Sequence, residues 1–134
     1  MFSSEEWAAL VGKLRQLTQA GKISWTAKGD SALSVDLGSA QYRLSSRDED
    51  DQPPWVLTVT KRSTDWTEPD RYVDSLTGIY QEEVSSIPAS LVPGLRDIAY
   101  RMSLGGPQLA SDLLSEMLEV DPTEPPKYYG DTPF

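Results

Sequence analysis

The sequence predicts a small α+β domain in which helices cover an antiparallel sheet of about four to six strands. A run of apolar residues at helical spacing opens the chain. Runs that alternate apolar and polar residues occupy its middle, and two further helical runs follow. The length of 134 residues suits one domain. We expect this domain over residues 1–120 and a proline-rich, extended tail over residues 121–134.

The first helix is expected over residues 4–20. Ser3 followed by Glu6 is the pattern of a capping box, in which the hydroxyl and the carboxylate each bond a free backbone amide. Gly21 can end the helix in the left-handed conformation. The apolar stripe that should face the core consists of Trp7, Leu10, Val11, Leu14 and Leu17.

Alternation with a period of two predicts the strands. Ile23 and Trp25 mark the first, and residues 33–37, 40–44 and 55–60 mark the next three. Glycine turns and a polar loop over residues 45–54 separate them. A last hairpin is expected from residues 71–74 and 79–82 about a turn at 75–78, with a helical interpretation of residues 76–84 left open.

Two helices are expected beyond Ile87, forming a hairpin that packs with the first helix. Ser90 can cap the earlier one, and Gly105 and Gly106 can end it. Its core face would hold Leu91, Leu95, Ile98 and Met102. The later helix should begin at Pro107 and end near Glu119. Its inward residues would be Ala110, Leu113, Leu114 and Met117.

The segment from Gly21 to Trp25, Gly-Lys-Ile-Ser-Trp, follows a helix that ends in Leu17-Thr18, and two helical runs close the chain at residues 95–101 and 109–118. This order resembles a group of small uncharacterised bacterial and phage proteins, over roughly residues 5 to 120. The resemblance implies an architecture and no activity. We interpret Gly21 to Trp25 as a structural corner, with glycine for the helix end and tryptophan for burial.

Composition excludes several functions. The chain has no cysteine and no histidine, which removes disulfides, thiolate nucleophiles, the commonest metal ligand and the commonest general base. We therefore expect no enzymatic activity, no metal and no cofactor. The chain starts with acidic residues and lacks the ~18 to 20 consecutive apolar residues of a membrane span, which favours a cytoplasmic location without a membrane partner.

Charge and aromatic residues indicate a protein partner. Twenty-one acidic against twelve basic residues give a net charge of -9, which repels nucleic acid and favours a partner with a basic surface. Aromatic side chains beside acidic ones are typical of protein interfaces. The candidate interface comprises Trp66, Asp65, Glu68, Asp70 and Tyr72, with Tyr128, Tyr129 and Phe134 of the tail.

The preferred hypothesis is a non-catalytic acidic protein-interaction module, with a bacterial or phage origin implied by the resemblance. Its sharper form is an inhibitor or immunity-like protein that covers a basic surface of its partner. One alternative is a small-ligand or sugar-binding protein or enzyme, whose pocket would use Asp65, Glu68, Asp70 and Asp74 beside Trp66. Another is a structural subunit of a homo-oligomer. The acidic run at residues 48–51 is expected to be a solvated loop.

Overall fold

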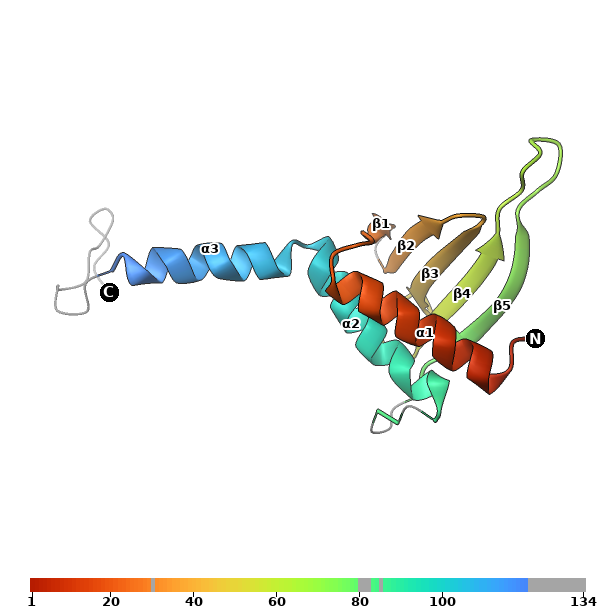
Figure 1. Ribbon diagram of the computed structural model, residues 1–134, viewed down its shortest axis with the longest axis horizontal. Helices are drawn as coiled ribbons and strands as arrows, with labels where there is room; N and C mark the ends of the chain where they lie inside the picture. The colour runs from red at the N-terminus through yellow and green to blue at the C-terminus, as the bar shows by residue number, and fades with distance from the viewer. Residues whose placement is uncertain (30, 80–82, 85, 121–134) are drawn as a thin grey trace. The chain divides into compact units, whose positions relative to one another are not determined.

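The computed structural model describes residues 1–29, 31–79, 83–84 and 86–120, and it divides into two units at Leu104 and Gly105. The elements of the first unit are α1 (Ser4–Gln19), β1 (Thr26–Lys28), β2 (Ala32–Leu37), β3 (Ala40–Ser46), β4 (Trp55–Lys61), β5 (Arg71–Thr77), the 3-10 helix η1 (Pro88–Leu91) and α2 (Val92–Ser103). The second unit contains α3 (Gly106–Leu118). The predicted α+β class is confirmed (Figure 1).

Helix α1 begins as the sequence predicts. The backbone amide of Glu6 donates to Ser3 Oγ at 3.1 Å, and the amide of Ser3 donates to Glu6 Oε1 at 2.9 Å. This capping box satisfies free amides at the start of the helix. Helix α1 ends one residue earlier than expected, with Ala20 as C-cap, and Gly21 follows with a φ of 70°.

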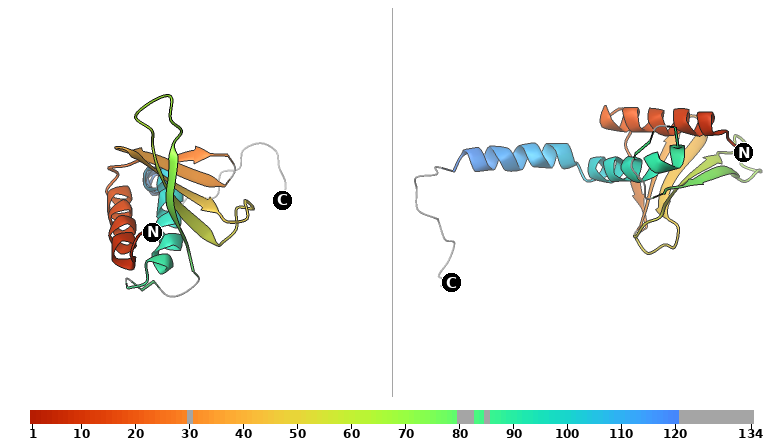
Figure 2. Two further views of the ribbon diagram at one scale, coloured as in Figure 1. Left: turned by 90° about the vertical axis from the view of Figure 1, so that its right-hand side faces the viewer. Right: turned by 90° about the horizontal axis from the view of Figure 1, so that it is seen from below.

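The five strands form one antiparallel sheet in sequence order, β1 to β5. The register places Leu33, Leu44, Leu57 and Leu76 side by side across β2 to β5. Both α1 and α2 lie on the face of the sheet that carries these leucines (Figure 2). The buried core between the sheet and the helices consists of Trp7, Val11, Leu14, Ile23, Trp25, Leu33, Val35, Leu44, Trp55, Leu57, Val59, Val92, Leu95 and Ala99.

The expected strand at Ile23 and Trp25 is wrong, because β1 begins only at Thr26. Both side chains are nevertheless buried, and the indole N–H of Trp25 donates to Thr18 Oγ1 at 2.9 Å. These residues alternate because they turn the chain from the end of α1 into the core. Our interpretation of residues 21–25 as a structural corner agrees with this arrangement.

The expected turn at residues 75–78 is also wrong. Strand β5 continues through Ser75 and Leu76 to Thr77, and these residues pair with Thr58, Leu57 and Val56 of β4. The side chain of Leu76 packs against the core, which favours a longer strand over a turn. The predicted partner strand at 79–82 falls largely on residues outside those that the structure describes.

Ser90 does not cap α2, which corrects our expectation. The residue before α2 is Leu91, and Ser90 lies within η1, where its buried hydroxyl accepts a hydrogen bond from the amide of Val84 at 3.0 Å. The buried side chains of α2 are Val92, Leu95 and Ala99. Ile98 and Met102 are only half-buried, so the core face of α2 lies slightly off the predicted one.

Helix α3 occupies the predicted place in the sequence, and it belongs to the second unit. None of its side chains is buried within its own unit, and the inward positions expected for Ala110, Leu113, Leu114 and Met117 stay predictions. Packing of the two C-terminal helices as a hairpin and the single domain over residues 1–120 stay predictions. The proline-rich tail over 121–134 lies outside the described residues.

Candidate functional site

The residues that join β4 to β5 form a loop that projects beyond the sheet (Figure 1). Lys61 and Arg71 are the last paired residues of the two strands, and the loop lies between them. Its position at the end of a hairpin keeps it away from the core under α1 and α2. Four of the predicted interface residues, Asp65, Trp66, Glu68 and Asp70, lie in this loop, and Tyr72 follows in β5.

Hydrogen bonds within the loop define its backbone. The amide of Ser63 donates to Asp70 Oδ1 at 2.9 Å, which closes the base of the loop. At the tip, the amide of Thr67 donates to Asp65 Oδ1 at 3.0 Å and that of Glu68 to the carbonyl of Asp65 at 3.0 Å. Such side-chain turns are the usual role of aspartate in loops. The loop therefore has a defined shape before any partner binds.

Trp66 projects from this loop with 95% of its surface exposed. The other three tryptophans, Trp7, Trp25 and Trp55, are each at most 7% exposed. Burial of a tryptophan removes about 150 to 250 Å² from water. The exposed indole of Trp66 therefore keeps a large surface in water whose burial would be favourable. Tyr72 adds a second exposed ring, at 60%, and its hydroxyl lies 3.0 Å from Ser75 Oγ.

The loop carries charges of both signs. Asp65, Glu68 and Asp70 are exposed. At the root of the loop, Lys61 lies directly across the ladder from Arg71. Like charges in such a pair destabilise a hairpin. Their proximity could have been read from the sequence had the register of β4 and β5 been known.

The aspartates of this region have lowered pKa values. The pKa of Asp65 lies below its usual value because the backbone amide of Thr67 donates to its carboxylate. The pKa of Asp74 is lowered by the amide of Phe2 and then by the N-terminal ammonium of Met1, 3.0 Å away. A general acid needs a raised pKa. Neither carboxylate therefore has the property that the enzyme alternative requires.

Asp74 lies apart from the acidic residues Asp65, Glu68 and Asp70 of the loop. It lies on β5 opposite Val59, and one carboxylate oxygen accepts hydrogen bonds from both Met1 and Phe2. This contact ties the start of α1 to the outermost strand. The structure thus separates Asp74 from Asp65, Glu68 and Asp70, with which the ligand-binding alternative combined it.

The acidic run at residues 48–51 has a more specific structural role than the solvated loop that we expected. Asp50 accepts hydrogen bonds from Ser46 Oγ at 2.7 Å and from the amide of Gln52 at 3.0 Å, and the first of these lowers its pKa. Asp51 lies 3.4 Å from Arg96 of α2. These contacts fold the loop back on itself and connect it to α2.

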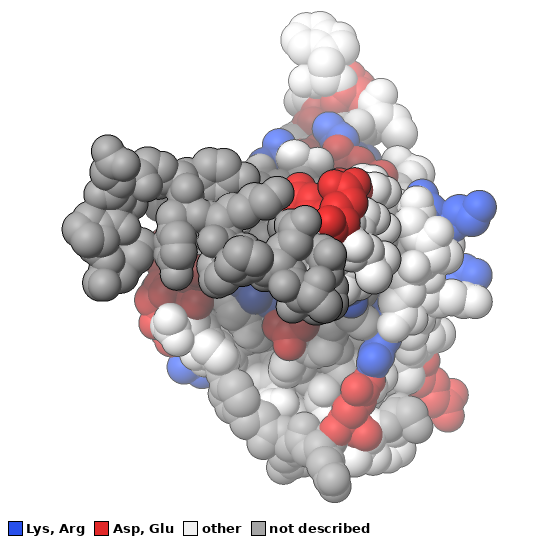
Figure 3. Space-filling view, turned by 90° about the vertical axis from the view of Figure 1, so that its left-hand side faces the viewer, with Lys and Arg blue, Asp and Glu red and all other residues white. Residues whose placement is uncertain are grey.

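Acidic and basic side chains both appear on the molecular surface, scattered among uncharged ones on the face shown in Figure 3. Over residues 1–29, 31–79, 83–84 and 86–120, no three acidic side chains are grouped so that they could hold a metal ion. In the same part of the chain, no helix is both long and apolar enough to cross a bilayer. Tyr128, Tyr129 and Phe134 lie outside the described residues.

Comparison of the chain with protein-family models, with curated proteins and with solved structures found no match to any of them. The resemblance to small bacterial and phage proteins therefore stays a prediction.

Proposed function

We propose that the chain is a non-catalytic protein-interaction module that binds a partner through the loop between β4 and β5. The exposure of Trp66 is the observation that carries the proposal. Tryptophan is the residue most enriched at the energetic centres of protein interfaces, where a ring of polar residues surrounds it. Asp65, Glu68 and Asp70 supply such a polar surround in the same loop.

The internal hydrogen bonds of the loop support this role. Association costs free energy when flexible groups must be ordered, and a loop that already has its bound shape avoids much of that cost. The bonds from Ser63 to Asp70 and from Thr67 to Asp65 hold the backbone on both sides of Trp66. The indole can then enter an apolar pocket of the partner with little rearrangement.

The net charge of -9 favours a partner with a basic surface. Opposite charges accelerate diffusional encounter, and salt screens this effect. Lys61 and Arg71 at the root of the loop place a local positive charge beside the acidic tip, so the complementary surface would carry an acidic group near its basic one. An inhibitor or immunity-like role in the cytoplasm of a bacterium or its phage is the specific form of this proposal.

Quantitative affinity capture from a bacterial lysate tests the proposal. Wild-type protein is compared with Trp66→Ala and with Ile87→Ala, a control that truncates another exposed apolar side chain of the same unit. Captured proteins that depend on Trp66 are then purified and their dissociation constants measured. We expect Trp66→Ala to weaken binding about 30-fold, as loss of a hot-spot tryptophan costs about 2 kcal/mol or more. If every captured protein is retained by Trp66→Ala as well as by wild type and Ile87→Ala, the proposal is overturned.

Self-association is the second candidate function. Strand β5 forms an outer edge of the sheet, and edges of this kind can pair with a second copy. The shift in register between Val59 and Thr60 opposes such pairing, since irregularities of this kind protect natural edges. Light scattering at increasing concentration distinguishes a monomer from an oligomer.

A further inference from the structure

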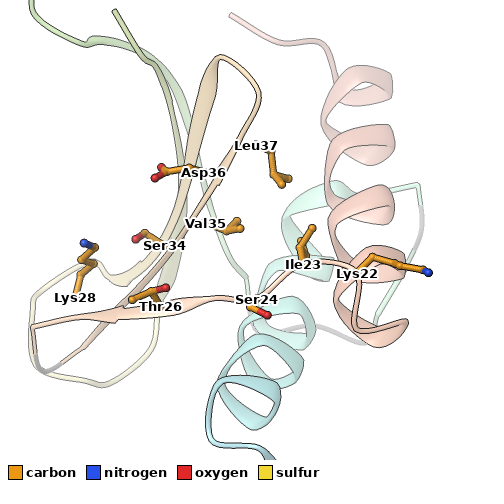
Figure 4. A pocket seen from close by; sticks show the side chains of 9 residues that line it. All are labelled: Lys22, Ile23, Ser24, Thr26, Lys28, Ser34, Val35, Asp36 and Leu37. Carbon is orange, nitrogen blue, oxygen red and sulfur yellow. The ribbon is translucent and has the colours of Figure 1, made fainter.

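The face of the sheet opposite to α1 and α2 carries mainly small polar side chains. Figure 4 shows Thr26, Lys28, Ser34 and Asp36 pointing away from the helices, while Val35 and Leu37 point toward them. The register extends this polar face across the sheet, because Ser34 pairs with Arg43 and Arg43 with Thr58. Neither helix of the first unit covers this face (Figure 2).

An open hollow of about 440 Å³ lies on this face. Its floor includes Ala32 of β2 and Ser45 of β3, which are paired with each other. Lys28 of β1 pairs with Ala32 from the opposite edge of β2. Arg43 lines the hollow two residues before Ser45 on the same face of β3. Two long basic side chains thus flank short ones, and this difference in length creates the hollow.

The hollow gathers positive charge in a chain that is strongly negative. Among the described residues, Arg47 is a third basic residue of its lining, against one carboxylate, that of Glu49. In the described part of the chain, no carboxylate lies within 4.0 Å of the charged groups of Lys28 or Arg43, whereas Arg47 lies 3.4 Å from Asp48, and Arg15, Arg62 and Arg96 each have an ion-pair partner.

The residues around the hollow are held in place. The amide of Arg47 donates to the carbonyl of Pro54 at 2.9 Å, and the side chain of Asp50 braces the same loop through Ser46 Oγ. Lys28 and Arg43 belong to paired strands. The positions from which the cations extend are therefore fixed, and only the ends of the side chains have to be ordered on binding.

We propose that this hollow binds the phosphate or sulfate group of a small molecule. The guanidinium of Arg43 offers two parallel N–H donors to a tetrahedral anion, and the ammonium of Lys28 supplies a second positive charge. The hydroxyl of Ser45 can donate from the floor of the hollow. Arg47 and Glu49 border the anion, and Glu49 can accept from a hydroxyl of the attached molecule.

A titration followed by backbone amide NMR tests this inference. Inorganic phosphate and sodium sulfate are added separately to the full chain at constant ionic strength, with chloride as the reference. With phosphate or sulfate, we expect saturable changes in the amide chemical shifts of Gly29, Ser31, Ser45 and Arg47. Chloride should not produce these changes. Phosphate or sulfate that produces only the chloride response overturns the inference.

Two variants with the same change in charge sharpen the test. Arg43→Gln removes a cation from the hollow, and Arg101→Gln removes an exposed one from α2. Loss of a charged hydrogen-bonding partner should weaken binding at least about tenfold for Arg43→Gln, and Arg101→Gln should bind as the wild type does. Lys28→Gln provides a second test if Arg43→Gln does not fold. Equal binding by all variants contradicts the inference.

This inference is independent of the proposed protein interface. Trp66 lies in the loop between β4 and β5 and does not line the hollow. Trp66→Ala should therefore bind phosphate with unchanged affinity, and failure of one proposal leaves the other standing.

Discussion

Trp25 and Thr18 join the first helix to the segment that leads into the sheet. The indole N–H of Trp25 donates to Thr18 Oγ1 at 2.9 Å, and this hydroxyl donates in turn to the carbonyl of Leu14 at 2.6 Å. Thr18 is fully buried and Trp25 is 4% exposed. The pair therefore satisfies every side-chain polar atom at this corner of the core.

Thr18→Val should destabilise the first unit, because it leaves the buried indole N–H without an acceptor while it keeps the shape of the side chain. The expected loss in the free energy of unfolding is about 1 to 3 kcal/mol. Thr18→Ser is the matched control, since it retains the hydroxyl. Urea denaturation measures both, and equal stability of Thr18→Val and wild type would refute this role of the hydrogen bond.

Arg96 is expected to stabilise the fold mainly through aromatic rings. Its guanidinium carbon lies 4.0 Å from the ring centroid of Trp55 and 4.4 Å from that of Tyr100, and only 17% of its side chain is exposed. Contacts of this kind contribute up to about 2 kcal/mol when they are desolvated, whereas an ion pair with an exposed carboxylate contributes about 0 to 1 kcal/mol.

Arg96→Ala should therefore lower the free energy of unfolding more than Asp51→Asn does, since Asp51 is 57% exposed. Thermal and urea unfolding of the two variants provide the comparison. If Asp51→Asn costs as much as Arg96→Ala, the ion pair and not the stacking holds the loop to α2.

The contact between Asp74 and the N-terminus predicts a dependence of stability on pH. Because the folded pKa of Asp74 lies below its ordinary value of 3.8, the unfolded chain binds more protons between the two values. This contribution to stability is present above the unfolded pKa and is lost as the pH falls through the folded one.

Asp74→Asn should accordingly reduce the loss of stability on acidification below about pH 4. Urea midpoints between pH 2 and pH 6 measure the effect, and Asp97→Asn is a control on the exposed side of α2. An identical pH profile for Asp74→Asn and wild type would show that the carboxylate does not stabilise the N-terminus.

A chain that ends at Leu104 should fold on its own. In the part of the chain that the structure describes, all of the buried core residues belong to the first unit, and the sheet and both of its covering helices lie within Met1–Leu104. We expect the truncated chain to keep its circular dichroism spectrum and a urea midpoint close to that of the full chain. A large drop in the midpoint would show that α3 contributes to the same core.

Local patterns predicted the elements that depend on neighbours in sequence. The capping box of Ser3 and Glu6 located the start of α1, and alternation located β2, β3 and β4 to within two residues at either end. The chain from Ile23 to Trp25 alternates equally well without forming a strand. Its side chains are buried by tertiary contacts, and alternation in the sequence alone does not distinguish such a segment from a strand.

The candidate site shows the same limit. The sequence indicated Trp66 and its acidic neighbours because tryptophan in a polar loop is unusual. It did not indicate that Lys61 faces Arg71, since this depends on the register of β4 with β5. The meeting of Lys28 in β1 with Arg43 and Arg47, which lie in β3 and directly after it, likewise depends on how the sheet places these two segments.

Fluorescence quenching of Trp66 in complex with a captured partner tests the central claim most directly. In the free protein, acrylamide should quench one exposed tryptophan out of four, and Trp66→Phe should remove this accessible fraction. Binding of the partner should protect the same fraction from acrylamide. Unchanged quenching in a saturated complex would contradict the claim that Trp66 is the centre of the interface.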